Sequence, residues 1–115
     1  MLQTHLKAFR DLLVGISPAV SVYHYHRPKM KAPYILWAED GEDSSFEADN
    51  HKEEQSIYGT LDYYTKTEYD PIVDEIQSAL NGFDNLSWRY DSTDYEDETN
   101  LIHHSWEWRL LCGIS

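Results

Sequence analysis

The sequence predicts an α+β domain in which about five strands form a largely antiparallel sheet and two helices pack on one of its faces. Three observations support this prediction. Two segments repeat apolar residues at the spacing of a helix, and several others alternate apolar and polar residues as half-buried strands do. Residues 53–80 contain both patterns in succession, so a strand that feeds a helix is expected at the centre of the domain.

The composition indicates a single globular domain that covers residues 1–115. The hydrophobic fraction of 41% is sufficient for a packed core and too high for disorder. Because the sequence shows neither a bilayer-spanning apolar run nor a charged-then-apolar leader, we expect a soluble protein that is not exported. The single cysteine, Cys112, cannot form an internal disulfide, which is typical of a reducing compartment. The formal net charge of −12 argues against binding to nucleic acid, because phosphates would be repelled.

The first predicted helix lies at the N-terminus, where apolar residues recur at spacings of three and four. These residues are Leu2, Leu6, Phe9, Leu13 and Ile16. Gly15 and the Ser17-Pro18 pair are expected to end the helix. A stripe of this kind is far more often core than a ligand site, so we expect the helix to pack on the sheet.

Two strands are predicted next, at residues 21–26 and 34–38, and a basic segment with two prolines separates them. We expect this segment to be a solvated hairpin loop, and it concentrates three cations, Arg27, Lys29 and Lys31. Residues 39–43 then predict an acidic turn with Glu39, Asp40, Glu42 and Asp43. Its oxygens do not have the spacing of a calcium-binding loop. Residues 44–48 are a candidate for another short strand.

The central strand and the second helix follow. Ile57, Gly59, Leu61 and Tyr63 fall on one face of an extended chain. Asp70 is suited to cap a helix that has Pro71 in its first turn, and Asn81-Gly82 is expected to provide a left-handed stop. The apolar stripe of this helix contains Ile72, Val73, Ile76, Ala79 and Leu80.

The last part of the chain predicts two antiparallel strands, at residues 86–91 and 101–111, joined by an acidic turn. The turn contains Asp94, Glu96, Asp97 and Glu98. One face of the final strand carries Ile102, His104, Trp106, Trp108 and Leu110, and we expect it to lie between sheet and helix. Burial of a tryptophan contributes about 2–3 kcal/mol, so this face should be critical for stability.

Histidines provide the only candidates for a metal or catalytic site. His24 and His26 project from the same face of a predicted strand, and His103 or His104 would have to complete a site. The sequence contains no HExxH motif, paired cysteines or glycine-rich phosphate loop. We therefore assign no catalytic, cofactor-binding or metal-binding residue and expect a protein that is not an enzyme. A metal-dependent α+β enzyme that uses His24, His26 and His104 remains an alternative.

Three segments resemble one family. They begin at Pro33 (PYILWAEDGEDSSFEADNHKEEQ), at Asp62 (DYYTKTEYDPIVDEIQSAL) and at Tyr95 (YEDETNLIHHSWEWRL). Together they resemble small tail-completion proteins of long-tailed phages and prophages of Gram-positive bacteria. More remotely, they resemble tail terminator and tail-to-head joining proteins, which are small α+β subunits that form hexameric rings. The resemblance implies a structural virion protein, located in the tail and in the host cytoplasm during assembly, with no catalytic residues.

The resemblance also implies partners, namely other copies of the chain in a ring and the proteins of the tail tube or head completion. A ring needs a contact between two different patches of the subunit. We expect the basic loop with Arg27, Lys29 and Lys31 to meet the acidic residues of a neighbour. An alternative function is that of an acidic DNA mimic that inhibits a nucleic-acid-binding protein.

Overall fold

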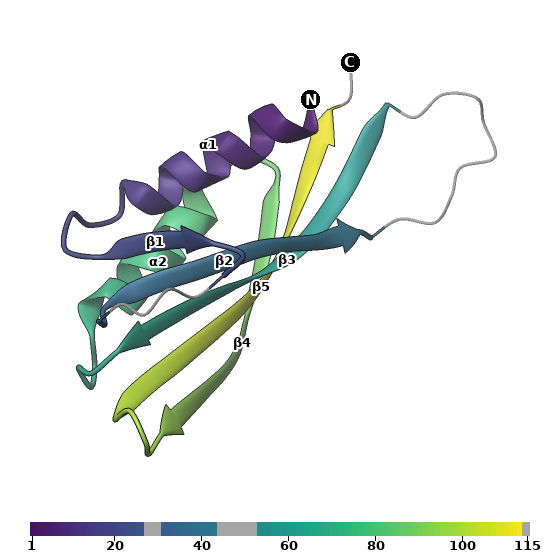
Figure 1. Ribbon diagram of the computed structural model, residues 1–115. Helices are drawn as coiled ribbons and strands as arrows, with labels where there is room; N and C mark the ends of the chain where they lie inside the picture. Colours follow the sequence, from purple (N-terminus) through teal and green to yellow (C-terminus); the bar gives the residue numbers. More distant parts are fainter. Residues whose placement is uncertain (27–30, 44–52, 114–115) are drawn as a thin grey trace.

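The structure is a computed structural model that describes residues 1–26, 31–43 and 53–113. Two helices and five strands are present in these ranges, and they form a mostly antiparallel α+β fold, as the sequence predicts (Figure 1). The elements in chain order are α1 (Leu2–Val14), β1 (Ser21–His24), β2 (Tyr34–Glu42), β3 (Glu54–Thr65), α2 (Pro71–Gly82), β4 (Leu86–Glu96) and β5 (Leu101–Gly113). No helix in the described ranges is long and apolar enough to cross a membrane.

The sheet has the strand order β1-β2-β3-β5-β4, and every neighbouring pair is antiparallel except β1 and β2. The parallel pairing shows that the predicted hairpin between these two strands is wrong. Strand β1 ends at His24, and the next residue, Tyr25, adopts a left-handed conformation with φ 73°. Strand β2 begins at Tyr34, which is paired with Ser21 at the start of β1, so both strands run in the same direction. Alternation of apolar residues identifies a strand but contains no information about its direction, which explains the error.

Both predicted acidic turns are in fact partly strand. Glu39, Asp40 and Glu42 belong to β2, which has a β-bulge between Glu39 and Gly41, and Asp43 follows it. Asp94 and Glu96 belong to β4, so the turn begins only after them. The ladder hydrogen bonds continue past the last apolar residue because charged side chains on a strand can point to solvent while the backbone stays paired. The candidate strand at residues 44–48 lies outside the described residues.

The core lies on the face of the sheet that carries three tryptophans. The register places Trp37 opposite Leu61 and Leu61 opposite Trp106, so these side chains share one face, with Trp108 two residues further along β5. In α1, the ring of Phe9 contacts Trp37 and Trp108, with ring centroids 5.4 and 4.8 Å apart. From α2, Gln77 Oε1 accepts a hydrogen bond from Trp106 Nε1 at 3.2 Å. One side chain of each helix, Phe9 of α1 and Gln77 of α2, therefore contacts these tryptophans.

Helix α2 begins as the sequence predicts but ends differently. Asp70 is its N-cap, and the Asp70 side chain accepts a hydrogen bond from the backbone N–H of Ile72 at 2.9 Å. The expected left-handed stop at Asn81-Gly82 is wrong, because no described glycine has a positive φ. The left-handed residue is Asn85, with φ 63°, immediately before β4. Gly82 instead is the last residue of the helix.

Candidate interaction surfaces

The structure describes Lys31 and all the predicted acidic contact residues, and these lie at two ends of the sheet. Paired residues run across the sheet in one row, from Tyr34 on β2 through Tyr64 and His103 to Asp94 on β4. Lys31 is exposed and lies just before Tyr34. The β4–β5 turn follows Asp94 at the same end of the sheet, at the β4 edge and three strands away from β2. Arg27 and Lys29 lie outside the described residues.

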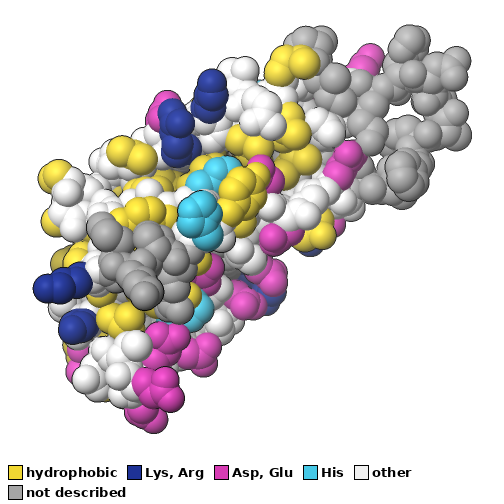
Figure 2. All heavy atoms as spheres, in the orientation of Figure 1, with side chains coloured by type: hydrophobic (Ala, Val, Ile, Leu, Met, Phe, Trp, Pro, Cys, Tyr) yellow, Lys and Arg dark blue, Asp and Glu magenta, His cyan; other side chains and the backbone are white. Residues whose placement is uncertain are grey.

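The acidic residues that the sequence predicts as contacts divide into two groups. Asp94, Asp97 and Glu98 are exposed, and Glu96 at the end of β4 accepts a hydrogen bond from the Thr99 hydroxyl. Figure 2 shows acidic side chains along the lower edge of the molecule and at its lower tip, where Figure 1 places the β4–β5 turn. The second group, in and after β2, lies toward the far end of that strand, and Glu39, Glu42 and Asp43 in it have partners within the chain.

Glu39 illustrates this second group. Its carboxylate accepts a hydrogen bond from the Tyr25 hydroxyl and lies 2.6 Å from His24 Nε2. Burial raises the pKa of Glu39, but these hydrogen bonds outweigh the burial, and its pKa lies below the usual value. Asp40 comes next along the strand and is exposed. Glu42 accepts a hydrogen bond from the side-chain amide of Gln55, and Asp43 forms an ion pair with Arg109. This group is less suited to receive a neighbour's basic loop.

The histidines do not converge on one site. The imidazole of His24 stacks between the rings of Tyr25 and Trp37, with centroids 3.7 and 3.9 Å away, while His26 is exposed. On β5, His103 projects from the face opposite to the tryptophans and contacts Asp62 at 2.7 Å. Among residues 1–26, 31–43 and 53–113, no group of three or more His, Cys, Asp or Glu could hold a metal ion.

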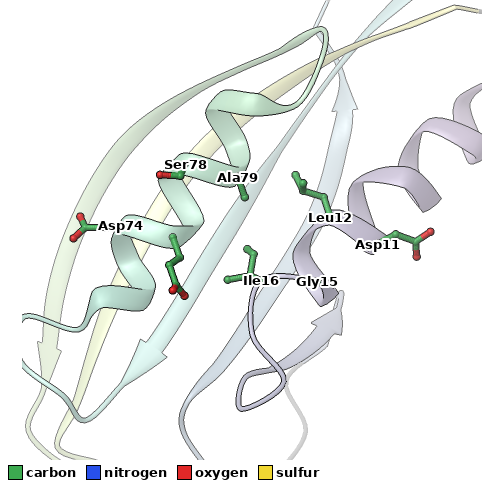
Figure 3. Close-up of a pocket in the computed structure, with 8 residues that line it drawn as sticks. Asp11, Leu12, Gly15, Ile16, Asp74, Ser78 and Ala79 are labelled. Carbon is green, nitrogen blue, oxygen red and sulfur yellow. The ribbon is translucent and has the colours of Figure 1, made fainter.

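A groove runs between the two helices and opens to solvent with a volume of about 570 Å³. Figure 3 shows that Leu12 of α1 and Ile16, just after that helix, face Ala79 of α2 across the groove, while Asp11 and Asp74 point away from it. The floor of the groove is therefore apolar and its borders are acidic. The sequence does not predict this groove, because the apolar stripe of each helix is expected to be buried in the core.

A second hollow of about 440 Å³ lies where α2 begins, beside β4 and β5. Val73, Ile102 and Tyr69 form its apolar walls, and Thr93 and His104 also line it. Tyr69 is the most exposed of the large hydrophobic residues in the described chain, with 92% of its surface accessible, and its φ is +56°. An exposed aromatic residue with left-handed backbone is unusual, and such features concentrate at functional sites.

Asp70 fixes the backbone around this second hollow. In addition to capping α2, its Oδ2 accepts hydrogen bonds from the Tyr63 and Thr65 hydroxyls, both at 2.7 Å. Burial raises the pKa of Asp70, but the hydrogen bonds from Ile72 N, Thr65 and Tyr63 lower it by more. The pKa therefore lies below its usual value, and the carboxylate is charged at pH 7. One side chain thus ties the end of β3 to the start of α2.

Comparison of the chain with known protein families finds no match, and no curated protein matches it.

Proposed function

We propose that this protein is a structural subunit of a long-tailed phage or prophage, a tail-terminator, tail-completion or head–tail joining protein that assembles into a ring. The observation that supports this proposal best is the placement of Lys31, just before β2, and the acidic β4–β5 turn at the same end of the sheet but three strands apart. The family resemblance of the sequence agrees with it. Tail-tube or head-completion proteins would be its other partners, in the virion tail and, during assembly, in the host cytoplasm.

The charge placement has the geometry that a ring requires. Strands β2 and β4 are separated by three strand steps, or about 14 Å. When subunits stand side by side around a ring, the β1–β2 edge of one meets the β4 edge of the next. Lys31 of one subunit would then lie on the side that faces Asp94, Asp97 and Glu98 of its neighbour. Such a contact joins two different patches, which is the heterologous type that closes rings.

Apolar surface at the same edge would provide most of the affinity. Exposed ion pairs contribute only about 0.2–1 kcal/mol each, so charge mainly sets orientation and register. Tyr90 and Tyr95 of β4 are 39% and 59% exposed. Tyrosine is enriched at protein interfaces because it combines a large apolar ring with a hydrogen-bonding end. The outer edge of β4 also has no neighbouring strand in the described sheet, so its backbone could pair with another subunit.

A charge-swap experiment tests the proposal. Lys31→Glu and the double change Asp97→Lys with Glu98→Lys should each weaken ring formation, and their combination should restore it because the attraction is re-formed with reversed signs. Native mass spectrometry and light scattering at low and high salt measure the assembly. Electron microscopy of a phage mutant lacking the protein, complemented with each variant, measures tail completion.

Lys7→Glu is the matched control, because Lys7 is an exposed lysine on α1 and belongs neither to the segment before β2 nor to the β4–β5 turn. It should assemble and complete tails like the parent. Parent-like assembly and tail completion by both single-edge variants at every salt concentration would overturn the charge contact. Normal tails from phage lacking the protein altogether would overturn the virion function itself.

The second candidate function, an acidic inhibitor that mimics DNA, is favoured by one observation. Acidic side chains gather along one edge of the face in Figure 2, whereas Lys and Arg lie mostly toward its upper and left sides. A mimic would compete with duplex DNA for a nucleic-acid-binding protein, and its affinity would fall steeply with salt. Competition binding with labelled DNA and host DNA-binding enzymes distinguishes this function from the ring.

A further inference from the structure

We propose that the hollow beside the start of α2 is an anchor site for one lysine or arginine side chain presented by a protein partner. The hollow, called here the Tyr69 pocket, is lined by Glu68, Tyr69, Val73, Asp74, Ile102 and His104. This inference does not depend on the proposed ring, because any protein that carries an exposed basic residue could supply the anchor. It rests on the shape, the exposed aromatic rings and the charge of the pocket.

The walls of the pocket suit the aliphatic part of a basic side chain. Val73 and Ile102 are partly buried and provide apolar contact from α2 and β5. Tyr95 is paired with Ile102 in the β4–β5 ladder and therefore lies on the same face, 59% exposed. Lysine and arginine bury their methylene groups against such surfaces and keep the charged end at the rim.

The charge of the pocket suits the cationic end. Glu68 and Asp74 line the pocket and are exposed, and none of the described lining residues is a lysine or an arginine. Lys66 is exposed nearby in the chain but does not line the pocket. Burial lowers the pKa of His104, whose Nδ1 hydrogen-bonds the Tyr90 hydroxyl at 2.8 Å, so the imidazole does not neutralise the carboxylates at pH 7.

The positive end of the α2 dipole does not reverse this preference. Asp70 already caps the helix by accepting the N–H of Ile72, and its carboxylate lines the same pocket. An anionic ligand would therefore meet three carboxylates. A cation would also gain from the ring of Tyr69, since the face of a tyrosine attracts Lys and Arg. These features together favour a basic anchor over an acidic or purely apolar one.

The anchor is tested with a small probe, Nα-acetyl-lysine methylamide, titrated into the ¹⁵N-labelled full chain and followed by NMR. The backbone amides of Tyr69, Val73 and Ile102 should shift and saturate. The same titration with Nα-acetyl-norleucine methylamide, which has the stem without the charge, should give much weaker binding. Replacement of both carboxylates in Glu68→Gln/Asp74→Asn should weaken binding of the lysine probe by about five- to tenfold.

The matched control is Glu54→Gln/Asp84→Asn, which makes the same change in net charge at two exposed carboxylates outside the pocket. It should bind the probe like the parent. Equal weakening by the control, equal binding of the norleucine probe, or no saturable shift at the three amides would each overturn the proposal. A stronger saturable response to putrescine than to the lysine probe would assign the pocket to a free polyamine and overturn it as well.

Discussion

Replacing Gly59 by alanine is expected to destabilise the fold strongly, although the change adds a single methyl group. Gly59 lies in β3 between β2 and β5, opposite Trp108. A Cβ built on Gly59 would lie 2.1 Å from the backbone oxygen of Ala38 and 2.4 Å from Cζ2 of Trp108. Carbon atoms in favourable contact are about 3.5–4.0 Å apart, so both neighbours would have to move.

Neither neighbour can move freely. The Ala38 oxygen belongs to the backbone of β2, and the Trp108 indole is buried, with its Nε1 donating a hydrogen bond to the Thr60 carbonyl at 3.0 Å. Overpacking of a core costs about 1–3 kcal/mol, and a clash with backbone on one side and a fixed ring on the other places Gly59→Ala at the upper end. For a chain of this size, a loss of about 3 kcal/mol lowers the melting temperature by about 12 °C.

Thermal unfolding followed by circular dichroism measures the effect, and Gly82→Ala is the control. Beyond the neighbouring residues and the backbone of α2 itself, no atom lies within 4 Å of a Cβ built on Gly82, which ends α2 without a positive φ. Alanine is favoured over glycine in a helix by about 0.5–1 kcal/mol, so this variant should melt at or above the parent temperature. A Gly59→Ala variant that melts within about 2 °C of the parent would refute the argument from close packing.

Three further predictions concern stability. Trp106→Ala and Ile76→Ala should each lower the free energy of unfolding in urea by about 3–5 kcal/mol, because both side chains are fully buried in the core. A loss of less than about 1 kcal/mol in either variant would contradict the assigned face. Asp70→Asn should cost about 1.5–3 kcal/mol at pH 7, because a charged acceptor of three hydrogen bonds becomes neutral. Since the folded-state pKa of Asp70 lies below 3.8, its contribution is present above that pH and is lost as pH falls through the folded pKa, so the difference between parent and variant should shrink in acid. His104 has a lowered pKa, so the unfolded chain takes up its proton first, and stability should fall as pH drops below about 6.5. A His104→Phe variant should lose less stability than the parent between pH 7.5 and pH 5, and equal losses would contradict this assignment.

The sequence alone determined most of the elements and much of the core, because burial follows the local period of apolar residues. The alternation of Ile57, Gly59, Leu61 and Tyr63 placed all four on one face, and all four are buried. Asp70 was identified as a helix cap from its position before Pro71, since capping depends on a few neighbouring residues. The pairing of the last two strands was predictable for the same reason, as their connection is short.

Only the tertiary structure decided three things: which strands pair in parallel, at which acidic residues β2 and β4 end, and which acidic side chains are exposed. The β1–β2 pairing depends on the path of the chain between them, which the period of the sequence does not specify. The sequence could not show that Glu39 has partners within the chain while Asp97 is exposed, because those partners, His24 and Tyr25, lie on another segment. The Tyr69 pocket likewise joins residues from the start of α2, β4 and β5. Contacts between distant segments arise when elements pack, so the surface that they create appears only in the folded chain.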